Sequence, residues 1–78
     1  MDSQKYVIVD GIMPIVFHGG LKHSSFKGMG EITSAGFCDI YSEENEVKVN
    51  CYGKSESLKI KSKPEDDIYL ISNWLYTY

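Results

Sequence analysis

Four side chains of this sequence could hold a soft metal ion or act as a nucleophile and its base, namely His18, His23, Cys38 and Cys51. Four nitrogen and sulfur ligands would suit a tetrahedral structural zinc ion. The two cysteines, however, stand far apart and lack the short spacing of zinc modules. Nothing in the sequence places a base within reach of a cysteine nucleophile or indicates an oxyanion site. The pattern therefore favours two buried thiols and two loop histidines, and no metal or cofactor is expected.

The two cysteines are expected on neighbouring strands. Cys51 follows Val47 and Val49 on the apolar side of an alternating segment, where a free thiol behaves as a small hydrophobic group. If Cys38 faces it from a paired strand, the two sulfurs could be close enough to bridge. The first residues lack the features of a secretory signal, which predicts a cytoplasmic location and reduced thiols.

Two short segments imitate catalytic motifs without completing them. Gly53-Lys54-Ser55 matches the end of a phosphate-binding loop, but Lys48 stands where the loop needs its first glycine, and no helix follows. His18-Gly19-Gly20 resembles the oxyanion loop of esterases, but there is no Gly-x-Ser-x-Gly turn to carry a nucleophile. The sequence therefore predicts a protein without enzymatic activity.

A polar cluster around Gly53 could bind a small molecule. Serine hydroxyls and a lysine stand close together there, and a glycine loop earlier in the chain could contact the same ligand. The plainer interpretation is that the serines face solvent or bond to turns, and that Ser62 helps to cap the following helix. The residues of this candidate ligand site are Lys54, Ser55, Ser57, Gly28 and Gly30.

The chain ends in a segment rich in aromatic rings. Aromatic side chains with a polar tip are frequent in the energetic centres of protein interfaces. The tail therefore suggests a docking patch or a dimer contact, although the same rings would also suit structural packing. The candidate partner-binding residues are Trp74, Tyr76 and Tyr78, with Tyr52 and Lys54 at the end of a predicted hairpin.

Hydrophobic periodicity predicts several strands and one long helix. The β-branched run that begins at Tyr6 ends at Asp10-Gly11, a turn typical of tight hairpins. Pro14 cannot donate to a sheet ladder, so the strand that resumes at Ile12 should lie at an edge. Further strands are expected over 31–41, 46–52 and 58–60, a helical turn over 21–26 and a helix over 64–75.

These elements predict an α+β fold with a single antiparallel sheet of about five strands and one C-terminal helix packed on one face. The apolar positions of the strand over 31–41 change sides at Gly36, which predicts a β-bulge or a close backbone approach. Pro64 suits the first position of the helix, where Glu65, Asp66 and Asp67 complement the helix dipole. The 78 residues are expected to form a single domain over 1–78.

The charge and hydropathy of the chain exclude two classes of partner. Eight basic residues stand against 11 acidic ones, which gives a formal net charge of −3. Duplex nucleic acid needs clustered cations, so nucleic-acid binding is not expected. No apolar run approaches the roughly 20 residues that cross a bilayer, so no membrane partner is expected either.

Three segments carry a resemblance to known proteins: Ser34-Ala35-Gly36-Phe37-Cys38, Cys51-Tyr52-Gly53-Lys54-Ser55-Glu56-Ser57-Leu58 and Ser62-Lys63-Pro64-Glu65-Asp66-Asp67. With them the chain resembles a set of small bacterial and prophage-encoded proteins of similar length, over most of the sequence after Lys5. No catalytic motif and no established activity defines that set. The resemblance implies a free-standing small protein and, by analogy with phage accessory proteins, one that binds a host protein.

The sequence thus predicts a non-enzymatic binding protein that docks to a protein partner, as an accessory or inhibitor protein of a phage or mobile element would, with a homodimer as one assembly. The alternative is a protein that sequesters a metabolite or a nucleotide signal in a pocket between protomers. In that case Lys54 and the neighbouring serines would contact the ligand.

Overall fold

The computed structural model describes residues 3–77, and within them the chain forms an α+β fold. The main antiparallel sheet has the spatial order β2-β1-β3-β4, and a separate ladder pairs β5 with β6. The elements in chain order are β1 (Gln4–Val9), β2 (Met13–Phe17), the 3-10 helix η1 (His23–Met29), β3 (Ile32–Glu43), β4 (Glu46–Tyr52), β5 (Lys54–Ser55), β6 (Ile60–Lys61) and α1 (Pro64–Thr77). The predicted α+β class is confirmed, with a four-stranded sheet and a two-stranded ladder in place of one sheet of about five strands.

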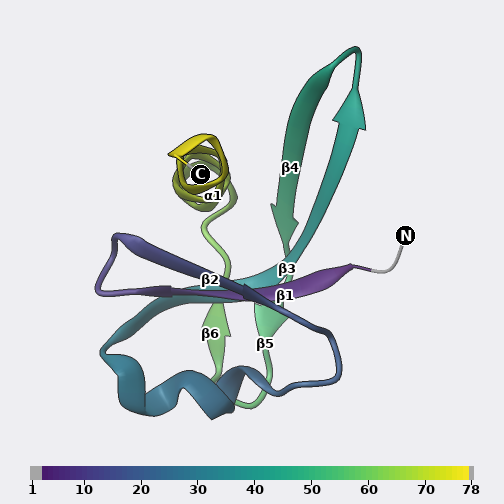
Figure 1. The fold of residues 1–78 in the computed structure, drawn as a ribbon. Coiled ribbons are helices and arrows are strands. Elements are labelled where there is room, and N and C mark those ends of the chain that lie inside the picture. Colours follow the sequence, from purple (N-terminus) through teal and green to yellow (C-terminus); the bar gives the residue numbers. More distant parts are fainter. Residues whose placement is uncertain (1–2, 78) are drawn as a thin grey trace.

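The sheet is covered on both faces. Helix α1 lies on one face, and η1 with the β5–β6 ladder lies on the other (Figure 1). Because side chains alternate along a strand, β1 supplies both cores. Tyr6 and Ile8 join Ile71 in the core under α1, whereas Val7 and Val9 join Phe17 in the core on the opposite face.

Local turn chemistry shapes the first hairpin as the sequence predicts. Asp10 and Gly11 both have positive φ, 55° and 74°, which matches the tight turn between β1 and β2. Pro14 lies opposite Ile8 in β2, which is an edge strand of the sheet. An edge position tolerates the missing N–H of proline, so the predicted edge strand is confirmed.

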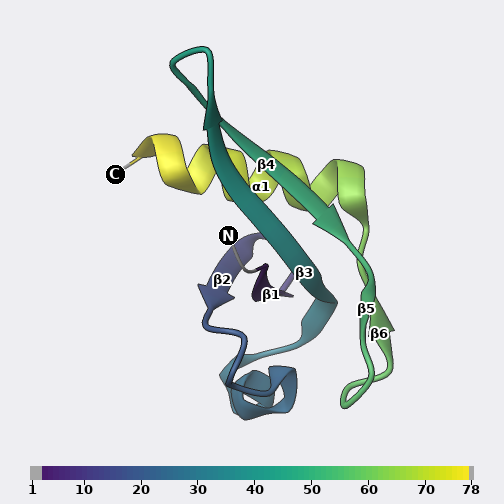
Figure 2. The same cartoon turned by 90° about the vertical axis from the view of Figure 1, so that its right-hand side faces the viewer.

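The long strand β3 pairs with a different strand along each of its two parts. Its first part, Ile32–Cys38, pairs with β1, and its second part, Phe37–Glu43, pairs with β4. The distal part of the β3–β4 hairpin is therefore a two-stranded arm, which extends away from the rest of the sheet (Figure 1). Helix α1 crosses this hairpin at an angle and packs against β4 (Figure 2). The strand continues to Glu43, two residues beyond the predicted end, because Glu44 and Asn45 alone make the turn with φ of 52° and 67°.

Gly36 sits where three strands crowd together. A Cβ atom there would lie 2.5 Å from the backbone oxygen of Tyr52. The predicted close approach is thus confirmed, whereas the register shift of β3 falls opposite Ile8 and Val9. The nearby Gly53 carbonyl oxygen accepts hydrogen bonds from Ser62 N at 3.1 Å and Ser62 Oγ at 2.8 Å. The prediction that Ser62 caps the helix is therefore wrong, because its hydroxyl holds the β5–β6 ladder closed.

Candidate functional site

A carboxylate is buried where α1 meets the sheet. Asp67 is only 1% exposed. One of its oxygens accepts hydrogen bonds from the hydroxyl of Tyr6 and from the backbone N–H of Lys63, the latter at 2.8 Å. The other oxygen accepts from Ser34 Oγ at 2.7 Å. Buried charge needs such donors, and these three tie the start of α1 to β1 and β3.

The sequence predicts only a dipole role for Asp67, and the structure shows a larger one. Glu65 and Asp66 are exposed, as dipole complementation requires. Asp67 stands four residues before Ile71, on the apolar stripe of the helix, and that position is the signal that could have identified it. A hollow of about 360 Å³ lies beside it. The three hydrogen bonds to the carboxylate join the start of α1 to the sheet, which gives Asp67 a structural role.

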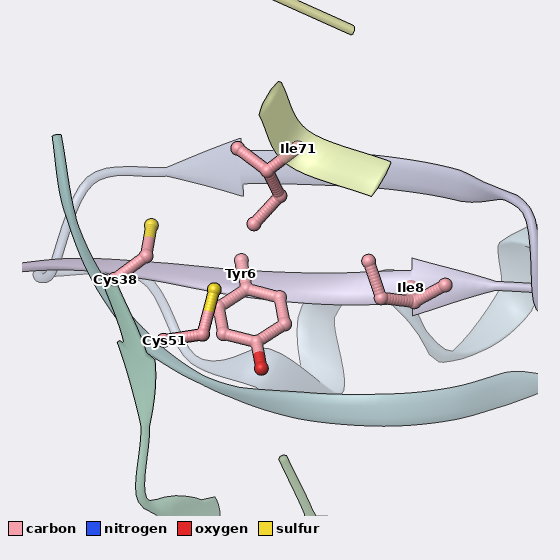
Figure 3. Close-up of a cluster of buried hydrophobic side chains, with 5 residues drawn as sticks. All are labelled: Tyr6, Ile8, Cys38, Cys51 and Ile71. Carbon is pink, nitrogen blue, oxygen red and sulfur yellow. The ribbon is translucent and has the colours of Figure 1, made fainter. Parts of the chain in front are cut away.

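The two cysteines face each other across β3 and β4. Cys38 and Cys51 are directly opposed in the register, and both are free and buried. Figure 3 shows them with Tyr6 in the core beneath Ile71. Burial raises the pKa of the Cys38 thiol to about 11, and burial together with the neighbouring Cys38 raises the pKa of Cys51 to about 12. Because the thiolate is the reactive form, these thiols serve packing, and the prediction of buried thiols is confirmed.

Alkaline solution should destabilise the protein because unfolding releases these thiols to ionise. An unfolded thiol titrates near pH 9.0, whereas Cys38 and Cys51 in the fold do so near 11 and 12. Between these values the unfolded chain binds fewer protons than the native one, so the free energy of unfolding falls as the pH rises. We expect a loss of about 2 kcal/mol from pH 9 to pH 10, measured by urea unfolding. Cys38→Ala should roughly halve that loss, and an undiminished loss in this variant would contradict the assignment.

A pocket of about 510 Å³ opens on the face of the sheet opposite α1. Its walls come from β1, η1 with the residue before it, β3 and the β5–β6 hairpin. Volumes in this range are typical of sites for small molecules. We call it the lysine pocket, and it is lined by Lys5, Lys22, His23, Phe37, Gly53, Lys54, Glu56 and Ser57.

Positive charge is concentrated in the lysine pocket. Three of the eight basic residues line it together with one glutamate, a formal charge of +2 on a chain of net charge −3. Lys5 Nζ donates to the backbone oxygen of Leu21 at 2.9 Å, which holds this ammonium group beside Lys22. Lys54 lies on the opposite wall with Glu56 and Ser57. The pocket therefore offers cations on two sides.

Aromatic side chains fix the inner part of the pocket. His23 is 4% exposed and its Nε2 lies 2.8 Å from the carbonyl oxygen of Gly36. Two phenyl rings pack against the imidazole in T-shaped contacts. The distance between ring centroids is 5.5 Å to Phe17 and 5.8 Å to Phe37. Phe37 in turn stacks with Tyr52 at 6.0 Å. The imidazole is therefore held in one orientation at the inner end of the pocket.

The structure separates the predicted ligand residues. Lys54 and Ser57 line the lysine pocket. Ser55 is buried and its Oγ accepts the N–H of Leu58 at 3.1 Å, which is the turn role of the plainer interpretation. Gly28 lies in η1 (His23–Met29), and Gly30, with a φ of 142°, lines a different hollow.

Sequence reasoning missed half of the lysine pocket. Lys5, Lys22, His23 and Phe37 come from parts of the chain distant from Lys54. The pairing of β1 with β3 places Lys5 opposite Phe37, and η1 with the residue before it adds His23 and Lys22. The sequence around each of these residues shows no binding motif. Their contribution could only be recognised once the strand order was known.

The predicted partner-binding residues are described only in part. Tyr52 is 38% exposed, and its hydroxyl lies in a hydrogen-bonding cluster with Ser3 and Asp39. Trp74 is half-buried on α1. The side chain of Tyr76, and Tyr78 as a whole, lie outside the described residues. Docking through this tail stays a prediction.

The histidines are engaged within the protein. His18 Nδ1 accepts the N–H of Gly20 at 2.9 Å, and His23 bonds to Gly36. In the part of the chain that the structure describes, no group of three or more His, Cys, Asp or Glu side chains is placed to hold a metal ion. Over residues 3–77, none of the helices has the length and apolar character to cross a membrane.

Comparisons with protein-family models, with curated proteins and with solved structures found no match for this chain.

Proposed function

We propose that this chain is a non-enzymatic binding protein whose lysine pocket receives a small anionic ligand. The observation that carries the proposal is the convergence of Lys5, Lys22 and Lys54 on one pocket of a chain with net charge −3. Neighbouring ammonium groups repel one another and raise the free energy of the folded state. A bound anion relieves that repulsion and stabilises the fold by linkage.

The lining supports a compact ligand that carries a carboxylate, sulfate or phosphate group. The ring of Phe37 offers an apolar wall, and Ser57 offers a hydroxyl between the charged side chains. A few polar groups in a partly apolar concavity are the usual composition of small-molecule sites. The pocket is formed within one chain, so this proposal does not need the second protomer of the sequence-based alternative.

Removing a lysine from the pocket should weaken anion binding. We expect Lys22→Gln and Lys54→Gln each to raise the dissociation constant for inorganic phosphate about five- to tenfold, because each removes one charge-assisted contact. The double variant should lose saturable binding. Isothermal titration calorimetry at low ionic strength measures the effect, since salt screens these interactions.

Two further variants control for overall charge. Lys48→Gln removes the same charge from the hairpin arm, where Lys48 Nζ lies 3.0 Å from Glu46 Oε2, and should leave phosphate binding unchanged. Glu56→Gln removes the one carboxylate of the pocket and should tighten binding. An equal loss in Lys48→Gln and Lys54→Gln would contradict a defined site, because only net charge would then matter.

A second candidate function is docking to a protein partner, as the resemblance to prophage-encoded proteins implies. The projecting arm favours it, because Tyr41, Val47 and Tyr52 on the hairpin are 38–41% exposed. Apolar side chains on a projecting hairpin are a common form of interaction surface. Native mass spectrometry of the protein purified from its own host separates the two proposals. A retained small mass supports ligand binding, and a retained polypeptide supports docking.

A further inference from the structure

We propose that His23 makes the lysine pocket selective for phosphate over sulfate. The inference rests on the proposed function and names the chemical class of the ligand: inorganic phosphate or a phosphate group that retains a proton. The observation behind it is the fixed orientation of one imidazole in a pocket that three lysines also line.

The bond between His23 and Gly36 sets the tautomer of the imidazole. A carbonyl oxygen can only accept a hydrogen bond, so Nε2 of His23 carries the proton at 2.8 Å from Gly36 O. In the neutral ring Nδ1 then has a lone pair and accepts. The edge contacts with Phe17 and Phe37 prevent the ring from turning away.

The free side of the imidazole belongs to the pocket. Among the described residues, every fully buried side-chain nitrogen or oxygen has a hydrogen-bond partner, and the bond observed for His23 uses Nε2. His23 lines the lysine pocket through its small exposed part, so the geometry points to Nδ1 as the atom that faces the pocket. A ligand in the pocket meets a hydrogen-bond acceptor at a fixed position.

The charged groups around His23 attract both ions alike. Lys5 on β1, Lys22 beside it in the chain and Lys54 on β5 are cationic, and Glu56 is the one carboxylate of the pocket. Strands β2 and β3 contribute the apolar rings of Phe17 and Phe37. The lysines thus supply attraction for any dianion, and Nδ1 supplies the discrimination.

Phosphate and sulfate differ in whether they carry a proton that can be donated to Nδ1. Near pH 8 both inorganic ions are tetrahedral dianions, but hydrogen phosphate keeps one P–O–H group that can donate to Nδ1. Sulfate has only acceptor oxygens, and one of them would face the lone pair of Nδ1 without a proton between them. An unpaired polar contact of this kind costs on the order of a tenfold change in affinity.

The test compares the two inorganic ions on the intact chain by calorimetry at constant ionic strength. At about pH 8 we expect phosphate to bind roughly tenfold more tightly than sulfate. This comparison needs no variant and stays informative if a substitution impairs folding.

His23→Gln provides the matched variant. Its amide nitrogen can still donate to Gly36 O, but the lone pair at the position of Nδ1 is lost, so the ratio at pH 8 should fall below about threefold. Equal affinities of the native protein for phosphate and sulfate at pH 8 would overturn the selectivity and leave the lysine pocket standing. Failure of both ions to bind would instead overturn the proposed function itself.

Discussion

Asp67→Ala should lower the free energy of unfolding by about 4 kcal/mol. The substitution leaves the Tyr6 hydroxyl, the Ser34 hydroxyl and the N–H of Lys63 without their acceptor at the joint between α1 and the sheet. Buried donors without partners cost about 1–3 kcal/mol each, and partial rearrangement recovers some of that sum. Urea denaturation followed by circular dichroism measures the change.

The neighbouring Asp66 provides the control for Asp67. It is exposed on the same turn of the helix and has the same relation to the helix dipole. Asp66→Ala should change the free energy of unfolding by about 0.5 kcal/mol or less. Asp67→Asn retains one acceptor oxygen and should fall between the two. Similar losses in the two alanine variants would show that the dipole, and not the buried network, accounts for the role of Asp67.

Gly36→Ala should destabilise the protein by about 3 kcal/mol. The new methyl group would lie 2.5 Å from the backbone oxygen of Tyr52 and 3.2 Å from Cβ of Ser62, so neither neighbour can yield without moving a strand. Overpacking against backbone typically costs about 1–3 kcal/mol, and this contact is at the severe end. The midpoint of thermal unfolding would show the effect.

Gly28 is the matched position for Gly36. A Cβ atom added there meets nothing within 4 Å. Gly28→Ala should therefore change the free energy of unfolding by less than about 1 kcal/mol. Alanine restricts the unfolded chain more than glycine does, so any change should be stabilising. Equal effects of the two substitutions would contradict the close approach of the strands at Gly36.

Local features of the sequence were sufficient for much of the fold. Asp10-Gly11 predicts a tight hairpin because its residues tolerate positive φ, and Pro14 predicts an edge strand because it lacks an N–H. The alternation that ends at Cys51 predicts a buried thiol. Each of these signals depends on a single residue or on its nearest neighbours, which is why they can be read without the structure.

The lysine pocket could not be predicted in the same way. Lys5 and Lys54 are in separate segments, and their meeting depends on the order of β1, β3 and the β5–β6 ladder. The β5 strand itself is only two residues long, too short to show a periodic pattern. The buried hydrogen-bonding role of Asp67 could not be predicted for a related reason, because its partners Tyr6 and Ser34 lie on strands distant in the sequence.

A phosphate titration followed by nuclear magnetic resonance tests the lysine pocket most directly. The amide signals of Gly53, Lys54 and Ser57 should shift along one saturable curve, while that of Lys48 on the hairpin arm should remain in place. Small uniform shifts that do not saturate, or shifts centred on the arm, would contradict an anion site in this pocket.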